Sequence, residues 1–151
     1  MSSLEEKIMC WEKLKNYFSK ANQAVAAQTG LKILTIEDDA TQRTLIQRTL
    51  EKKGHSVLIA EDGRKGLELA QRERPDLIIL DVVMPQMRGD EVCRRLKTDS
   101  RTKDIPVLFL TSLDTPKDVI EHYDLGADVH LTKPINPKEL IRQVDISLKG
   151  K

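Results

Sequence analysis

Acidic, hydroxyl and amino side chains follow several short apolar segments of this chain, each at the point where the segment ends. In chain order these side chains belong to Glu37, Asp38, Asp81, Thr111 and Lys133. Carboxylates that crowd together repel one another, so their pKa values rise unless a cation joins them. A hard cation such as Mg2+, which prefers oxygen ligands, is the natural partner of such a group. The sequence therefore predicts a divalent-cation site built from carboxylates.

One of these carboxylates could also react. A carboxylate can attack phosphorus as a nucleophile and become an aspartyl phosphate. The product carries new negative charge, which Mg2+ and the ammonium group of Lys133 would offset. Thr111 would supply a hydroxyl donor near a phosphoryl oxygen. Together these side chains have the properties of a phosphoryl-acceptor site.

The segments that precede these residues have the pattern of parallel strands covered on both faces. Residues 33–36, 77–80 and 107–110 are apolar almost without interruption, whereas a strand with one wet face would alternate. The expected strands are Lys32–Ile36, Val57–Glu61, Leu77–Leu80, Val107–Leu110 and Val129–Thr132. Amphipathic stretches separate them, and parallel strands need such crossover helices. We expect an open α/β sheet whose ligands collect beyond the carboxyl ends of its strands.

Length and composition indicate a single ordinary domain. The 151 residues are 39% hydrophobic and 32% charged, and the formal net charge is +1. Such a balance gives no general attraction to nucleic acid or to an anionic membrane. No apolar run approaches the roughly 18–20 residues that span a bilayer. The first residues lack the pattern of a secretory signal, so we expect a cytoplasmic protein without nucleic-acid or membrane partners.

Four motifs resemble those of response-regulator receiver domains, which accept phosphoryl groups in two-component signalling. They are residues 33–38 (ILTIED), 80–85 (LDVVMP), 110–112 (LTS) and 126–134 (GADVHLTKP). Their order and spacing also agree, and the resemblance covers residues 31–149. It implies a flavodoxin-like fold, a five-stranded parallel sheet with strand order 2-1-3-4-5, preceded here by an N-terminal helical extension.

The resemblance also implies roles for individual residues. Asp81 would be the phosphoacceptor. The metal ligands would be Glu37, Asp38, Asp81 and the backbone carbonyl of Val83. The cofactor would be Mg2+, with Mn2+ as an alternative. Lys133 would pair with the phosphoryl group, its position fixed by a cis bond to Pro134.

Two further positions would transmit the signal. Thr111 would move toward the phosphoryl oxygens, and the residue at the family's aromatic switch position, here His130, would turn inward. His130 could equally be a half-buried ring that only packs. As a histidine, it could make the response depend on pH. His122 has no partner at metal-binding spacing and is expected on the surface.

Val83 and Leu113 lie two residues after Asp81 and Thr111. In the family, these two places influence how readily water attacks the acyl phosphate. Because apolar side chains cannot orient a water molecule, we expect a long-lived phosphoryl group.

A signalling domain is expected, not an enzyme with a separate substrate. The implied partners are a histidine kinase or histidine phosphotransfer protein, and a downstream protein target. An aspartate-dependent phosphatase would need a second aspartate where Val83 stands. A flavin-binding module would need a phosphate-cradling loop after the first strand, where residues 37–39 are acidic. A degenerate receiver used only for docking would lack part of this complete residue set.

Residues 1–30 differ in kind from the receiver-like residues 31–151. Apolar side chains at three- and four-residue steps predict an amphipathic helix; they are Leu4, Ile8, Trp11, Leu14, Phe18, Ala21 and Val25. This stripe could pack on its own domain or form a coiled-coil homodimer through residues 4–28. The dimerising or docking role is favoured, because the standard sheet lacks none of its core helices.

Overall fold

The computed structural model describes residues 30–112 and 116–149. Strands and helices alternate along this part of the chain. They are β1 (Lys32–Ile36), α2 (Ala40–Glu51), β2 (Ser56–Ala60), α3 (Gly63–Glu73), β3 (Leu77–Asp81), α4 (Gly89–Thr98), β4 (Val107–Thr111), α5 (Pro116–Asp124), β5 (Val129–Thr132) and α6 (Pro137–Lys149). The helix predicted for residues 1–30 lies, apart from Gly30, outside the described residues.

The five strands form one parallel sheet in the order β2-β1-β3-β4-β5, which confirms the predicted fold. The central strands β3 and β4 are buried along their whole length, as their uninterrupted apolar pattern predicts. Three of the expected strands differ slightly: β2 lies one residue earlier, and β3 and β4 extend to include Asp81 and Thr111. The two functional candidates are thus the last residues of their strands, held by the sheet itself.

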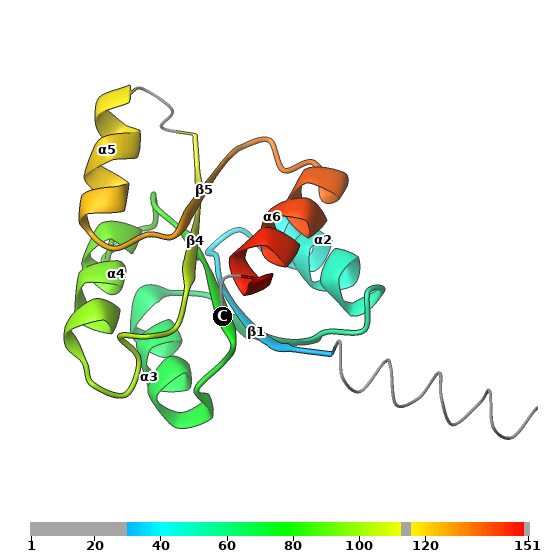
Figure 1. The fold of residues 1–151 in the computed structure, drawn as a ribbon, viewed down its shortest axis with the longest axis horizontal. Coiled ribbons are helices and arrows are strands. Elements are labelled where there is room, and N and C mark those ends of the chain that lie inside the picture. The colour runs from blue at the N-terminus through cyan, green and yellow to red at the C-terminus, as the bar shows by residue number, and fades with distance from the viewer. Residues whose placement is uncertain (1–29, 113–115, 150–151) are drawn as a thin grey trace, which may run out of the picture. The chain divides into compact units, whose positions relative to one another are not determined.

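Two apolar cores lie on opposite faces of the sheet. Alternate side chains of each strand point to opposite faces, so Ile33 and Ile79 join one core while Leu34 and Leu80 join the other. Helices α3 and α4 cover one face, and α2 and α6 cover the other (Figure 1). Burying one such side chain contributes about 1.5–3 kcal/mol, so the sheet is held firmly between its helices.

Caps at the helix ends fix the loops that leave the carboxyl edge of the sheet. The Asp39 carboxylate accepts a hydrogen bond of 2.9 Å from the Gln42 amide and caps α2. Asn136 accepts in the same way from the Lys138 amide at 3.0 Å, at the start of α6. Gly126, with φ +99°, ends the turn after α5 in the left-handed conformation that glycine adopts readily.

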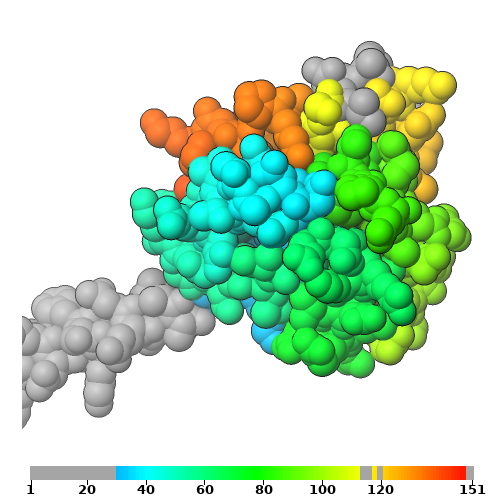
Figure 2. Space-filling view, turned by 180° about the vertical axis from the view of Figure 1, so that it is seen from behind, coloured from blue at the N-terminus to red at the C-terminus, as the bar shows by residue number. Residues whose placement is uncertain are grey.

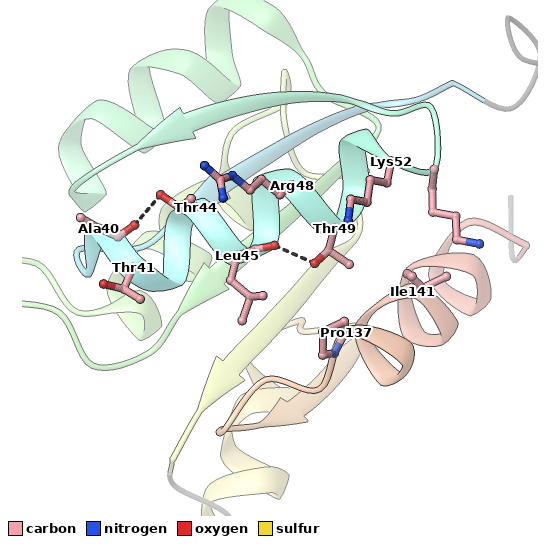
Figure 3. Close-up of a pocket in the computed structure, with 10 residues that line it drawn as sticks. Ala40, Thr41, Thr44, Leu45, Arg48, Thr49, Lys52, Pro137 and Ile141 are labelled. Atoms are coloured by element: carbon pink, nitrogen blue, oxygen red, sulfur yellow. Dashed lines mark hydrogen bonds between the residues drawn. The ribbon is translucent and has the colours of Figure 1, made fainter.

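A groove of about 750 Å³ lies between α2 and α6 (Figure 3). Its lining residues are Ala40, Thr41, Thr44, Leu45, Arg48, Thr49, Lys52, Lys53, Pro137 and Ile141. None of them is an acidic side chain of the predicted metal site. In the described part of the chain, the helices lack the length and hydrophobicity needed to cross a bilayer.

Candidate functional site

The carboxyl ends of the strands bring the predicted site residues to one edge of the sheet. Backbone hydrogen bonds continue past the strand ends there: the Val82 amide donates to the Leu110 carbonyl at 3.0 Å, and the Lys133 amide to the Thr111 carbonyl at 2.8 Å. In Figure 2 the cyan surface that begins α2 lies between the orange segment before α6 and the bright green segment after β3. Side chains from three separate parts of the chain can therefore meet.

Three carboxylates converge at this edge. Glu37, Asp38 and Asp81 each offer an oxygen, and these oxygens lie within 4.8 Å of one another. Glu37 is fully buried, Asp81 is 2% exposed, and Asp38 is exposed. The cluster thus has a buried floor and one side that is open to solvent. An all-oxygen set of this kind suits Mg2+, which keeps several waters and takes few carboxylates.

The ammonium group of Lys133 lies between the two buried carboxylates. Its Nζ is 3.0 Å from Oε2 of Glu37 and 3.2 Å from Oδ1 of Asp81. Backbone amides hold the same carboxylates: Asp39 donates to Oε1 of Glu37 at 3.2 Å, and Val83 donates to Oδ1 of Asp81 at 3.3 Å. These contacts fix the orientation of both acids.

The buried acids bind protons more tightly than ordinary carboxyl groups. Burial and then repulsion from Asp81 raise the pKa of Glu37 to about 7, although Lys133 opposes the shift. Burial likewise raises the pKa of Asp81, against the effects of its hydrogen bonds and of Lys133. When all are ionised, three carboxylates face one ammonium group. A divalent cation would balance the remaining two negative charges.

Gly89 is a site residue that sequence reasoning missed. Its amide donates to the Val82 carbonyl at 2.9 Å, which closes the loop after β3. A Cβ at this position would lie 2.2 Å from the Asp81 carbonyl oxygen, so a side chain would displace the backbone of Asp81. The signal in the sequence was a glycine at the first position of a helix, where glycine has no conformational advantage.

The remaining predicted residues lie around this cluster. Thr111 is fully buried at the end of β4, and the Lys133–Pro134 peptide bond is cis. Val83 exposes 48% of its surface beside Asp81. Leu113 lies outside the described residues.

A ring cluster lies further along β4 and β5. His130 is half-buried and stacks on His122 of α5, with ring centroids 5.2 Å apart. His122 in turn meets Phe109 edge to face at 4.7 Å. The prediction that His122 lies on the surface is wrong, because the inner face of α5 carries it against the sheet, where it is only 3% exposed.

Comparison with known proteins agrees with this geometry. Residues 33–145 match the response regulator receiver domain. The DNA-binding dual master transcriptional regulator RpaA of Synechocystis sp. is 45% identical over 118 residues, which are 78% of this chain and 49% of that protein. Protein PilH of Pseudomonas aeruginosa is 37% identical over 119 residues, 79% of this chain and 98% of that protein.

A solved structure extends the comparison to three dimensions. The chemotaxis response regulator CheY4 of Vibrio cholerae is 37% identical and superposes with a TM-score of 0.76, over 80% of this chain and all of that one. The chain spans about half the length of several relatives, RpaA among them, and nearly the whole of PilH. From its matched sequence and its fold, the chain belongs to the response-regulator receiver domains of two-component systems.

Proposed function

We propose that Asp81 accepts a phosphoryl group from a histidine kinase or a histidine phosphotransfer protein, with a divalent cation bound beside it. One observation supports this above all. Oδ1 of Asp81 lies 3.2 Å from the Lys133 ammonium, and an Asp81 carboxylate oxygen lies within 4.8 Å of oxygens from Glu37 and Asp38. A nucleophile, a cation site and a fixed positive charge therefore share one small volume.

The transfer forms one bond and breaks another. A carboxylate oxygen of Asp81 bonds to phosphorus while the phosphorus–nitrogen bond of the donor's phosphohistidine breaks, and the leaving imidazole takes up a proton. Val83 and Lys133 hold Oδ1, so we assign the attack to Oδ2. Lys133 is already in place to offset the charge of the product.

The cation would be held by Glu37, Asp38, Asp81 and the backbone carbonyl of Val83. Mg2+ supplies charge compensation for the phosphoryl oxygens when it is bound, and Mn2+ could replace it. Glu37 is the ligand that the protein holds most firmly, because it is fully buried and bonded to both Lys133 and the Asp39 amide. Asp38, on the open side, would meet the ion as it arrives from solvent.

Thr111 and His130 would carry the change to a downstream protein. His130 belongs to the ring cluster and lies on β5 in register with Phe109, and Thr111 ends β4 two residues after Phe109. A movement of Thr111 toward the phosphoryl group would loosen the packing of Phe109 and His122, and His130 stacks on His122. Ring-proton NMR signals of His130 should shift when the protein is phosphorylated. Unchanged signals would leave His130 with a packing role only.

The phosphoryl group is expected to be long-lived. Val83 presents a half-exposed apolar side chain beside Asp81, which cannot orient an attacking water, and the same argument applies to the sequence position of Leu113. Loss of label from the isolated phosphoprotein measures the lifetime. Polar replacements at Val83 and Leu113 should shorten it; equal, rapid loss with and without them would contradict the proposal.

Residues 4–28 are proposed to form a homodimer or to dock on a partner. Their apolar stripe repeats with the spacing of a short coiled coil. Sedimentation of the full chain should give a larger mass than expected for one copy, whereas a chain that starts at Gly30 should be monomeric. Identical monomeric behaviour of both would exclude the dimer.

Acetyl phosphate tests the phosphoryl-acceptor function directly, because it replaces the unidentified protein donor. Wild-type protein with Mg2+ or Mn2+ should gain one phosphoryl group, and should gain almost none with chelator. Asp81→Asn should gain none with either ion. Equal labelling of wild type and Asp81→Asn would contradict the assignment.

A further inference from the structure

Arg43 reaches back from the first turn of α2 to the loop that carries the acidic pair. Its Nη1 donates to the carbonyl of Glu37 at 2.9 Å and to the carbonyl of Asp38 at 2.8 Å. The backbone amide of Arg43 also donates to the carbonyl of Asp39 at 3.0 Å. One residue therefore holds three consecutive carbonyl groups of the loop.

This loop needs such an anchor, because it has already left the sheet. β1 ends at Ile36, and the last sheet-like bond joins the Glu37 amide to the Ala60 carbonyl at 3.1 Å. Asp38 is exposed, so burial does not hold its carboxylate in place. The direction of that carboxylate depends on the backbone of the loop, which Arg43 holds through its carbonyl groups.

We propose that Arg43 is a positioning residue, which holds the backbone of Glu37 and Asp38 so that their carboxylates are arranged for a divalent cation before it binds. The inference rests on the proposed function and deepens it. Groups behind the direct ligands often control metal affinity in this way, because they fix the ligands' orientation.

The guanidinium has a second effect, of opposite sign. The guanidinium is bonded to the backbone of Glu37 and Asp38, so its positive charge also opposes an incoming cation, and removing the charge alone would tighten Mg2+ binding. Removing the hydrogen bonds would weaken binding, because the loop would have to be ordered when the ion binds. The two effects predict opposite results for one variant.

Arg43→Met keeps an unbranched side chain but removes the charge and the hydrogen-bond donors together, so the Mg2+ affinity of this variant shows which of the two effects is larger. We expect its dissociation constant for Mg2+, measured by calorimetry on the full chain, to be about tenfold weaker than that of wild type. Arg43→Lys should recover part of the affinity, since an ammonium group can still bond to these carbonyls. Arg48→Ala is the matched control; Arg48 is an exposed arginine of the same helix that lines the α2–α6 groove, and its loss should change nothing.

Amide hydrogen exchange gives a second readout that needs neither metal nor phosphorylation. In chelator, the amides of Asp39 and Gln42 should exchange faster in Arg43→Met than in wild type, while thermal unfolding confirms that the variant is folded. Binding of Mg2+ by Arg43→Met as tight as in wild type, or tighter, would overturn the inference and leave the proposed function standing. Failure of wild type itself to bind Mg2+ would instead remove the metal site on which both rest.

Discussion

The acidic cluster and the ring cluster lie on neighbouring strands but are held together by different forces. At the strand ends, Glu37 and Asp81 are fixed by an ammonium group and by backbone amides at 3.0–3.3 Å. Phe109 of β4, His122 of α5 and His130 of β5 contact one another through their rings, with centroids 4.7 and 5.2 Å apart. Charges therefore fix the side chains of the first region, whereas packing fixes those of the second.

The largest effect is expected from removing the phenylalanine of the ring cluster. Phe109 is fully buried, so Phe109→Ala leaves a cavity and should lower the free energy of unfolding by about 3–5 kcal/mol. Urea unfolding measures the loss, and calorimetry on the folded protein should find unchanged Mg2+ affinity. A loss below about 1 kcal/mol would mean that the cluster is not packed as described.

Removing the Lys133 ammonium group from the acidic cluster should affect the phosphorylation rate. In Lys133→Met the folded protein should still bind Mg2+, but phosphorylation by acetyl phosphate should slow by roughly 100- to 1,000-fold, as for other lost charge-stabilising groups. The reason is that Lys133 Nζ lies 3.2 Å from Oδ1 of Asp81, on the same carboxylate as the oxygen to which we assign the attack. Rates of label incorporation at saturating Mg2+ measure the effect. A rate near that of wild type would show that the cation alone offsets the new charge.

The acidic cluster should make stability depend on pH when Mg2+ is absent. The pKa of Glu37 is raised from 4.5 to about 7 in the folded protein, so the folded state binds this proton more tightly than the unfolded state does. The free energy of unfolding should therefore fall as the pH rises from about 4.5 to about 7, by on the order of 1–2 kcal/mol once solvent screening is allowed for. Mg2+ binds the ionised form, so it should stabilise the protein more at pH 8 than at pH 5.

Urea unfolding at both pH values, with Mg2+ and with chelator, measures this linkage. The same series on Glu37→Gln is the control, because that variant lacks the titrating group. In chelator, its free energy of unfolding should lose most of its dependence on pH. Equal stabilisation of wild type by Mg2+ at both pH values would contradict the pKa assignment.

The smallest effect is expected at His122. Its Nδ1 is buried and has no hydrogen-bond partner within the part of the chain that the structure describes. Because an unsatisfied buried polar atom costs about 1–3 kcal/mol, His122→Phe should stabilise the protein by about 1 kcal/mol. Urea unfolding measures this, and the rate of phosphorylation should not change. A destabilised variant would mean that the histidine has a polar role in the ring cluster.

The sequence predicts the strands and the residues at their ends, but not the geometry of the loops or the rotation of the helices. Runs such as 77–80 identify buried parallel strands, and parallel strands place their carboxyl ends together, so the meeting of Glu37, Asp38, Asp81 and Lys133 followed from order and spacing. The close approach of Gly89 to the Asp81 carbonyl and the return of Arg43 depend on loop geometry, which residue types alone do not reveal. The burial of His122 depends on how α5 is rotated against the sheet.

We propose that the acids at the carboxyl ends of β1 and β3 surround a cation, and that Asp81 among them takes the phosphoryl group. Borohydride reduces an acyl phosphate to an alcohol, so it would convert a phosphorylated aspartate to homoserine in place. After treatment with acetyl phosphate and Mg2+, peptide mass spectrometry should find homoserine at position 81 and aspartate at position 38. Reduction at Glu37 or Asp38, with Asp81 intact, would contradict the account.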